Sequence, residues 1–217
     1  MRVSEGSESR RGTAREVVEV FADVTCPFAH VGLRRFVAHR DALKVTTPVL
    51  RVRAWPLELV NGEPLEPDVV ARHVDELRQQ VAPDLFRDFD VESLPKSSMP
   101  TLEMVAAAYQ LGDQPGERMS LLVRDALFEH GLDLGRPEVL ARIAATEGID
   151  LPTAEAERRV LDDYEDGKRR GVRGSPEFFV DGRGWYCPSL QIEKVGQDLR
   201  IRPDLEEIQA FLATCFA

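Results

Sequence analysis

Two segments near the start of the chain have the hydrophobic pattern of strands in a sheet. Residues 17–24 are mostly apolar and β-branched, and residues 45–55 (VTTPVLRVRAW) alternate enough to predict a second strand. The intervening residues 27–43 carry apolar side chains close to helical spacing and begin with Pro27, which a first helical turn tolerates. The pattern predicts a β-α-β unit, with Pro48 indicating that the second strand lies at a sheet edge or begins late.

From about residue 64 to residue 167 the pattern is helical throughout. Five runs with helical spacing follow proline-containing starts: VVARHVDELRQQV, LEMVAAAYQLG, ERMSLLVRDALFEHG, EVLARIAATEG and AEAERRVLDDYEDGKRRG. Strand character returns at residues 177–180 (EFFV), a short strand is expected at 185–187, and a last helix at about 203–215. The acidic residues 162–166 are interpreted as a solvated helix face.

These patterns predict an α/β protein with one sheet domain, built from residues 16–63 and 168–217, and an inserted all-helical domain at residues 64–167. Residues 1–15 are polar and charged, so we expect a disordered arm and no secretory signal. No apolar run approaches the roughly 18 residues that span a bilayer. A cytoplasmic location is therefore expected.

The charge balance is acidic, because 38 Asp and Glu against 28 Lys and Arg give a formal net charge of −10. The arginines are scattered among acids, which argues against nucleic acid and anionic membrane surfaces as partners. The three cysteines, at positions 26, 187 and 215, match neither a disulfide framework nor a zinc-ligand spacing. We expect free thiols, no metal site, and a core position for Cys215 on the apolar face of the last helix.

Cys26 lies where the first predicted strand ends and the first predicted helix begins. A thiol at a helix N-terminus faces unpaired backbone N–H groups and the positive end of the helix dipole, both of which favour the thiolate. We therefore expect Cys26 to be more acidic than a free cysteine. Proline at position 27 does not destabilise the helix, because the backbone N–H that it lacks would have had no partner in the first turn.

The residues around Cys26 also carry a family resemblance. The stretch DVTCPFAHVG at 23–32 resembles the active-site turn of DsbA-like oxidoreductases, in the branch with FrnE-type proteins, 2-hydroxychromene-2-carboxylate isomerases and kappa glutathione transferases. The stretch GVRGSPEFFVDG at 171–182 resembles the cis-proline loop and the strand after it, and residues 126–150 resemble the helical domain. The resemblance covers about 16–190 and implies a thioredoxin fold with a helical insertion.

The same resemblance implies roles for the site residues. Cys26 is expected to be the catalytic thiol, with Pro27 beside it and Pro176 cis against it, which leaves the backbone of Ser175 free to pair with a thiol substrate. That substrate is a peptide or a small glutathione-like molecule, and relatives are often homodimers. No tightly bound cofactor is implied, although a low-molecular-weight thiol is a possible cosubstrate.

Ala29 departs from the family pattern, because dithiol members have a second cysteine at this position. No disulfide can form within the motif, so a mixed disulfide on Cys26 needs another thiol to resolve it. The preferred hypothesis is a thiol-disulfide oxidoreductase working through this single cysteine. The alternatives are a thiol-dependent transferase or isomerase acting on a small aromatic electrophile, and a non-catalytic binding protein.

Other residues are weaker candidates. Phe28 and Trp55 are candidates for the apolar rim of a substrate groove, although apolar residues beside a strand end more often pack in the core. His30, one turn past Cys26, can stabilise a thiolate if its side chain points back; a partly exposed histidine without a role is the alternative. Cys187 could approach Cys26, but bridging requires Cα atoms within about 7 Å, which the sequence does not show.

Overall fold

The computed structural model describes residues 15–149 and 154–217, so the predicted arm at 1–15 lies almost wholly outside the described residues. A four-stranded sheet forms the centre, in the order β2 (Val49–Ala54), β1 (Val17–Ala22), β3 (Glu177–Val180) and β4 (Arg183–Tyr186). β1 runs parallel to β2 and antiparallel to β3, and β4 is antiparallel to β3. The predicted α/β thioredoxin architecture is confirmed, and β2 is an edge strand as Pro48 indicated.

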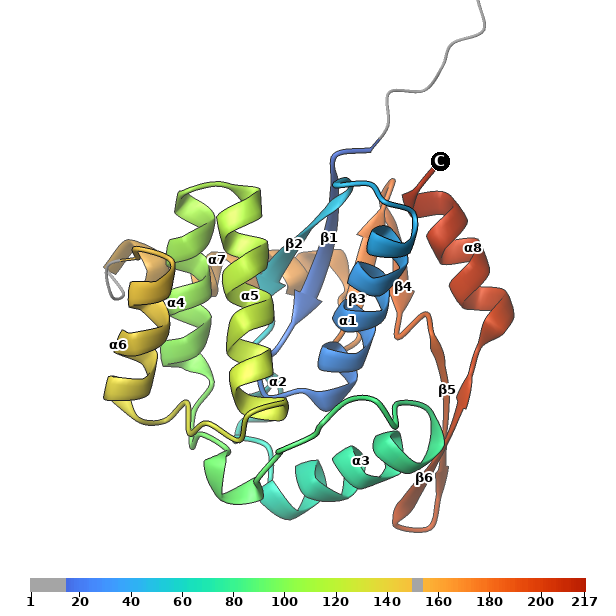
Figure 1. Cartoon of the computed structure of the whole chain (residues 1–217), viewed down its shortest axis with the longest axis horizontal. Coiled ribbons are helices and arrows are strands. Elements are labelled where there is room, and N and C mark those ends of the chain that lie inside the picture. The colour runs from blue at the N-terminus through green and yellow to red at the C-terminus, as the bar shows by residue number, and fades with distance from the viewer. Residues whose placement is uncertain (1–14, 150–153) are drawn as a thin grey trace, which may run out of the picture.

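Helices cover both faces of the sheet (Figure 1). On one face, α1 (Pro27–Ala42) and α8 (Leu205–Cys215) pack through Phe36 and Phe211 against Phe178 of β3, with ring centroids 5.0 to 6.4 Å apart. On the other face, α7 (Ala154–Arg170) lies over Phe21 and Trp55. Cys215 is fully buried in α8, as predicted.

The five predicted helices of the middle segment are present. They are α3 (Pro67–Gln80), α4 (Met99–Gln110), α5 (Asp113–Phe128), α6 (Pro137–Thr146) and α7, with a short α2 (Leu57–Asn61) and a 3-10 turn (Val91–Ser93) before and between them. α4, α5 and α6 stand beside the edge of the sheet at β2, whereas α3 crosses below the N-terminal end of α1 (Figure 1). The boundaries proposed for the inserted domain stay a prediction.

The outer edge of β2 is closed by side chains of the inserted helices. Three alternate backbone N–H groups of β2 each donate to one helix: Leu50 to Glu117 of α5 at 2.7 Å, Val52 to the Tyr109 hydroxyl of α4 at 2.8 Å, and Ala54 to Asp163 of α7 at 3.1 Å. An open edge would leave these donors free to pair with another chain. The expectation of a solvated acidic face is wrong at Asp163, which is buried because it serves this edge and Arg53.

A second, two-stranded sheet was not predicted. β5 (Leu190–Val195) and β6 (Asp198–Pro203) form a hairpin whose residues are mostly exposed and polar on both faces, so the sequence lacks the alternation that marks a half-buried strand. Side chains of α3 accept hydrogen bonds from the outer edge of β6. The N–H of Leu199 donates to Glu76 at 2.7 Å, and the N–H of Ile201 donates to Gln80 at 2.8 Å. Side chains of one helix therefore replace a third strand.

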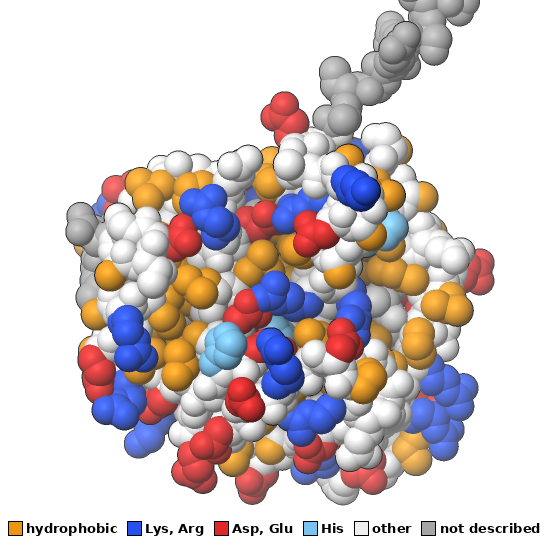
Figure 2. Space-filling model, in the orientation of Figure 1, with side chains coloured by type: hydrophobic (Ala, Val, Ile, Leu, Met, Phe, Trp, Pro, Cys, Tyr) orange, Lys and Arg blue, Asp and Glu red, His pale blue; other side chains and the backbone are white. Residues whose placement is uncertain are grey.

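The surface is mixed in charge. On the face in Figure 2, Lys and Arg side chains are interspersed with Asp and Glu, and neither sign forms a continuous field. Within residues 15–149 and 154–217, no helix combines the length and the apolar character that crossing a membrane requires.

The edge closure predicts that Gly116→Ala strongly destabilises the protein. A Cβ at Gly116 would lie 2.0 Å from Cδ1 of Tyr109, so the ring would have to move and give up its bonds to Val52 N–H and the Leu50 carbonyl. Overpacking and two buried unpaired groups should lower the free energy of unfolding by about 3 kcal/mol, measured by urea denaturation. In a Tyr109→Ala background the same substitution should cost much less, and an equal cost there would contradict this explanation.

Candidate active site

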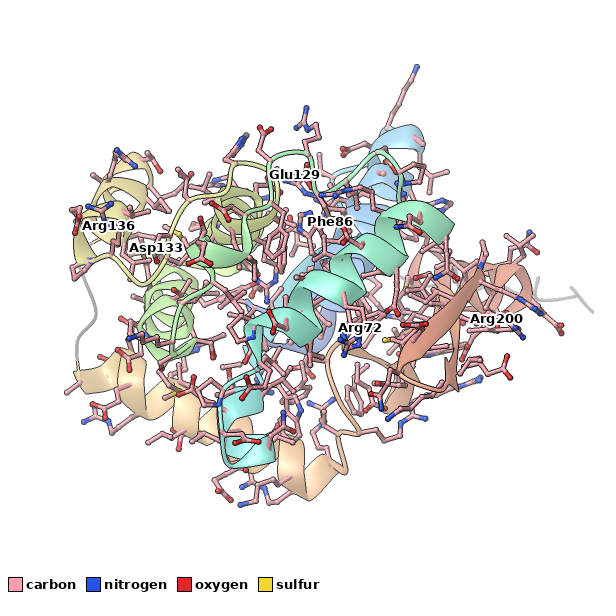
Figure 3. All side chains as sticks on the ribbon, turned by 90° about the horizontal axis from the view of Figure 1, so that it is seen from below. Arg72, Phe86, Glu129, Asp133, Arg136 and Arg200 are labelled. Atoms are coloured by element: carbon pink, nitrogen blue, oxygen red, sulfur yellow. The ribbon has the colours of Figure 1, made fainter. Side chains whose placement is uncertain are left out.

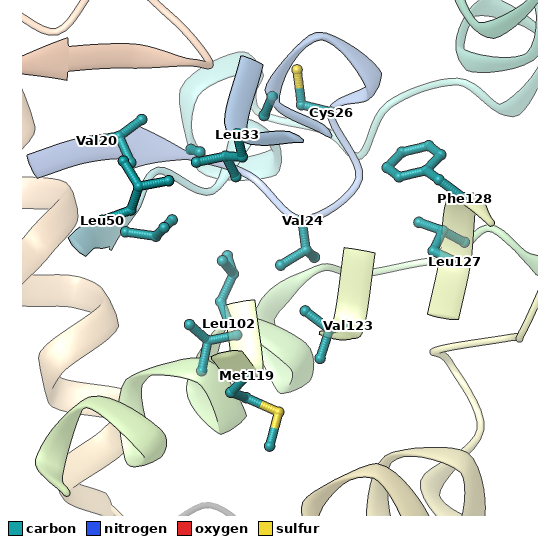
Figure 4. Packing of buried hydrophobic residues seen from close by; sticks show 14 of the residues in the cluster. Val20, Val24, Cys26, Leu33, Leu50, Leu102, Met119, Val123, Leu127 and Phe128 are labelled. Atoms are coloured by element: carbon teal, nitrogen blue, oxygen red, sulfur yellow. The ribbon is translucent and has the colours of Figure 1, made fainter. Parts of the chain in front are cut away.

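Cys26 occupies the N-cap position of α1, directly after β1 and a short turn. Its side chain lies on the opposite side of the turn from Val24, which points into the core between the sheet and α5 (Figure 4). Pro27 has no backbone N–H, but it lies in the first helical turn, where such an N–H would have no intrahelical partner. The turn therefore directs the thiol away from Val24 and towards the loop before β3, where it stays buried.

The loop before β3 lies against the thiol. Cys26 Sγ donates to the carbonyl oxygen of Ser175 at 3.1 Å, and the backbone N–H of Asp23 donates to the Ser175 hydroxyl at 3.0 Å. The Ser175–Pro176 peptide bond is cis, and the Pro176 ring packs close to Gly32 of α1. Residues about 150 positions apart in the sequence thus meet as the resemblance implied.

Burial raises the pKa of the Cys26 thiol above its ordinary value. The Ser175 hydroxyl and the backbone N–H groups of Ala29 and Phe28 act in the opposite direction, whereas the negative charge of Asp23 raises the pKa further. The expectation of a more acidic cysteine is therefore wrong for Cys26 as it is buried in this structure. Only 4% of the residue is exposed, and loss of hydration outweighs the helix N-terminus.

The carboxylate of Asp23 joins this turn to two other segments. It accepts hydrogen bonds from the N–H and hydroxyl of Thr25, both at 2.8 Å, from the N–H of Leu57 at 2.7 Å and from the hydroxyl of Ser98 at 3.0 Å. The side chain is 1% exposed. Four donors on one buried carboxylate fix the turn in place.

Arg124 lies behind the turn in the core of the inserted helices. Its guanidinium donates to the Asp23 carbonyl at 3.1 Å and to the carbonyl and hydroxyl of Ser120 at 2.8 and 2.7 Å. Burial lowers its pKa to about 10, so the group is still charged at neutral pH, and the negative charge of Asp23 favours that state. A cation of α5 therefore faces the acidic turn from inside the protein.

His30 is buried, which makes the expectation of a partly exposed helix histidine wrong. Its Nε2 lies 2.7 Å from Glu129 Oε1, and its ring packs on Phe86 and Phe128. Burial lowers the pKa of His30, so the neutral ring donates to a charged Glu129. The side chain joins α1 to the end of α5 and is directed into the interior, not towards a substrate.

Glu129 is held by backbone donors as well. The N–H groups of Phe86 and Arg87 donate to its carboxylate at 2.8 and 3.4 Å, and Figure 3 shows Glu129 and Phe86 side by side. Burial alone would raise the pKa of Glu129, but the hydrogen bonds from His30 and from these N–H groups lower it to about 2. The charged carboxylate thus anchors the loop after α3 to the active-site helix.

The other predicted site residues have different positions. Phe28 is half-buried at the start of α1 and meets the ring of His73 of α3, at 5.4 Å between centroids. Ala29 is fully buried, and its backbone N–H faces the thiol. Trp55 is buried between Phe21 and Tyr164 under α7, which places its ring in core packing. Of the two residues proposed for the apolar rim, Phe28 lies at the end of α1 that carries the thiol, and Trp55 lies in the core.

Sequence reasoning missed four residues that build the site: Thr25, Ser98, Arg124 and Glu129. Thr25 follows Asp23 by two positions, the spacing of an Asx turn, and Ser98 precedes a helix start with proline, so both carried a readable signal. Arg124 and Glu129 look like ordinary polar positions of an amphipathic helix. Among the residues described, no group of three His, Cys, Asp or Glu side chains is arranged to hold a metal.

The His30–Glu129 pair predicts a pH-dependent cost for Glu129→Gln. Because the pKa of Glu129 is about 2 in the folded protein and ordinarily 4.5, the ionised group stabilises the fold above pH 4.5, and this contribution is lost as the pH falls towards 2. The substitution should lower the free energy of unfolding by about 2 kcal/mol at pH 7 and by progressively less below pH 4.5. Glu63→Gln, in an exposed loop, is the matched control; a cost for Glu129→Gln that does not change with pH would contradict the assignment.

The comparison with family models identifies one match. The model of the DSBA-like thioredoxin domain matches residues 17–199, which include the Cys26 turn, the inserted helices and the Ser175–Pro176 loop. No curated protein matches the chain.

Solved structures with the same fold include enzymes of two kinds. A 2-hydroxychromene-2-carboxylate isomerase is 16% identical with a TM-score of 0.61, covering 78% of this chain and 88% of its own. The cytosolic disulfide reductase DsbM from Pseudomonas aeruginosa is 20% identical with a TM-score of 0.55, covering 91% and 97%. A second DsbM structure, with GSH, gives a TM-score of 0.59 at 16% identity, covering 91% and 98%. At these identities the likeness concerns the fold, and the family match over most of the length shows that the chain belongs to the DSBA-like thioredoxin domain family.

Proposed function

We propose that the protein is a thiol-disulfide oxidoreductase that works through Cys26. One observation carries the proposal: the Cys26 thiol lies at the N-terminus of α1, hydrogen-bonded to the Ser175 carbonyl and faced by the backbone N–H groups of Phe28 and Ala29. These N–H groups stabilise negative charge on sulfur, which the attacking thiolate carries. Membership of the DSBA-like family supports the same chemistry.

The first step is an exchange at Cys26. The Cys26 thiolate attacks one sulfur of a disulfide R–S–S–R′, so that a Cys26–S–S–R bond forms, the S–S bond of the substrate breaks, and R′S⁻ leaves and takes up a proton. Because Ala29 replaces the second cysteine of the motif, the mixed disulfide is then reduced by a further thiol. A low-molecular-weight, glutathione-like thiol is the proposed cosubstrate, and the DsbM structure with GSH supports this choice. No tightly bound cofactor takes part.

The raised pKa of Cys26 belongs to the buried thiol that is hydrogen-bonded to Ser175. Its Sγ–H donates to the Ser175 carbonyl, which is also the acceptor that an extended thiol substrate would use. Pairing of a substrate with the backbone of Ser175 would take this acceptor, leaving the thiol to release its proton. The N–H groups of Phe28 and Ala29 then stabilise the anion. Substrate binding and thiol activation are linked through one carbonyl.

A second function is favoured by the same raised pKa. A buried, protonated Cys26 can hold the sulfur of another thiol by hydrogen bonding without exchanging with it, as a transferase or isomerase of a small aromatic electrophile requires. The fold shared with 2-hydroxychromene-2-carboxylate isomerase is compatible with this role. The two functions differ in one observable, the formation of a covalent bond at Cys26.

The proposed setting is the cytoplasm, where the three cysteines stay reduced. The DsbM structure is described as that of a cytosolic reductase, which supports this placement. A homodimer stays a prediction, as does the absence of nucleic acid and membrane partners.

The proposed function predicts two properties of Cys26 in the intact protein. The rate of alkylation of Cys26 by iodoacetamide should rise with pH and have its midpoint above the pKa of about 8.5 for a free thiol, because burial raises the pKa of Cys26. Oxidised glutathione should nevertheless convert Cys26 to a disulfide, either mixed with glutathione or within the chain, detected by mass spectrometry of the intact chain and its peptides, with Cys26→Ser as the blank.

Two outcomes would contradict the proposal. Failure of folded protein to form any disulfide on Cys26 between pH 7 and pH 9 would exclude exchange, and binding of reduced glutathione to the same sample would then favour the transferase or isomerase function. A mixed disulfide on Cys187 or Cys215 with Cys26 still free would show that the reactive thiol is a different one.

A further inference from the structure

We infer that Cys187 is the resolving cysteine of this protein, taking the place of the second cysteine that the motif lacks. The inference rests on the proposed function, because it concerns the fate of the mixed disulfide on Cys26. Its observation is that the two cysteines contact consecutive carbonyl groups of one short loop: Cys26 Sγ donates to Ser175 O, and Cys187 N–H donates to Pro176 O, each at 3.1 Å.

The ladder of the sheet fixes where Cys187 lies. β3 and β4 are antiparallel with Glu177 opposite Tyr186 and Phe178 opposite Trp185, so the next pair outward is Pro176 and Cys187. Directly opposed residues in such a ladder have Cα atoms roughly 4.5 to 5.5 Å apart. Cys187 is therefore the cross-strand neighbour of the proline whose preceding carbonyl holds the Cys26 thiol.

The segments that carry the two thiols also meet on one side of the sheet. Pro176 and Phe178 both face α1, since the ring of each lies beside Gly32, and opposed residues of an antiparallel pair point to the same face. Trp185, opposite Phe178, packs on Phe211 on that face. Cys187 comes two residues after Trp185 and is 4% exposed, and Cys26 begins the helix that covers this face.

The chain turns directly at Cys187. Its φ is 43°, in the left-handed region that non-glycine residues seldom adopt, and the N–H of Leu190 closes the turn onto the Cys187 carbonyl at 2.9 Å. β4 ends one residue earlier, so Cys187 is the first residue of the connection between β4 and β5. This connection holds Cys187 beside the Ser175–Pro176 loop, whose Ser175 carbonyl accepts from the Cys26 thiol.

The electrostatics of Cys187 are consistent with a position near Cys26. Burial raises the pKa of Cys187, and the next contribution in the same direction comes from Cys26, so the two thiols lie close enough to interact. This agrees with the position of Cys187 beside Pro176.

The resolving step balances without an outside oxidant. The Cys187 thiolate attacks the sulfur of Cys26 in Cys26–S–S–R, the Cys26–Cys187 bond forms, and RS⁻ leaves and takes up the proton that Cys187 released. Two molecules of a low-molecular-weight thiol then reduce the internal disulfide and become oxidised to their own disulfide. The single-cysteine motif is completed by a cysteine from a neighbouring strand end.

Cys215 serves as the matched control. It is a fully buried cysteine in α8, and the charged groups that affect its pKa are Arg15 and Asp181, at the opposite end of β3 from the Ser175–Pro176 loop. It should take no part in the exchange, although it shares the burial of Cys187.

The test uses folded full-length protein and the chromogenic disulfide 5,5′-dithiobis(2-nitrobenzoate). The intact protein should release two molecules of thionitrobenzoate per chain and end with a Cys26–Cys187 disulfide, identified by peptide mass mapping, with no aryl group retained. Cys187→Ala and Cys187→Ser should release one and keep the aryl group on Cys26. Cys215→Ser should behave as the unchanged protein does.

The outcomes separate this inference from the proposed function. A stable aryl disulfide on Cys26 in the unchanged protein, or an internal disulfide to Cys215, would overturn the role of Cys187 and leave exchange at Cys26 intact. Failure of Cys26 to react at all would overturn both. The measurement on the unchanged protein decides the question even if the variants at position 187 fold poorly.

Discussion

The site depends on the complete hydrogen bonding of Asp23. Its N–H donates to the Ser175 hydroxyl, its carbonyl accepts from Arg124, and its carboxylate accepts from the turn itself, from the start of α2 and from the start of α4. A buried carboxylate that lost one of these donors would be destabilised, so the hydrogen bonds hold each partner segment in place. Asp23, three residues before the thiol, thus fixes the segments that surround the thiol.

The inserted helices are consequently part of the active site. α4 supplies Ser98 to Asp23, and α5 supplies both Arg124 behind the turn and Glu129 beside His30 of the active-site helix. The sheet alone would present a cysteine at a helix N-terminus, with the electrostatics that such a position implies. The surrounding helices remove water from that position. The effect of burial therefore outweighs that of the N–H groups, and the pKa of Cys26 is raised. The reactivity of Cys26 then depends on how a substrate changes the burial and hydrogen bonding of the thiol.

The sequence predicted the fold well because hydrophobic periodicity and proline-containing helix starts mark elements that bury one face. It failed for the β5–β6 hairpin, whose polar strands are held by Glu76 and Gln80 of a distant helix. For the site, Cys26, Ser175 and Pro176 could be found from their motifs. The direction of the pKa shift of Cys26 could not, because it depends on how much water the helices exclude, a property of packing and not of the residues next to the cysteine. Asp163 and His30 were misjudged for the same reason.

The closure of β2 by Glu117, Tyr109 and Asp163 makes the helices part of the sheet that they cover. Excising the helical segment would uncover three donors along an edge strand and give a molecule prone to self-association, so the sheet domain alone is not a usable engineering scaffold. The unit formed by α3 and the β5–β6 hairpin, by contrast, closes no edge of the main sheet. Surface substitutions in this unit should therefore leave the edge of β2 closed.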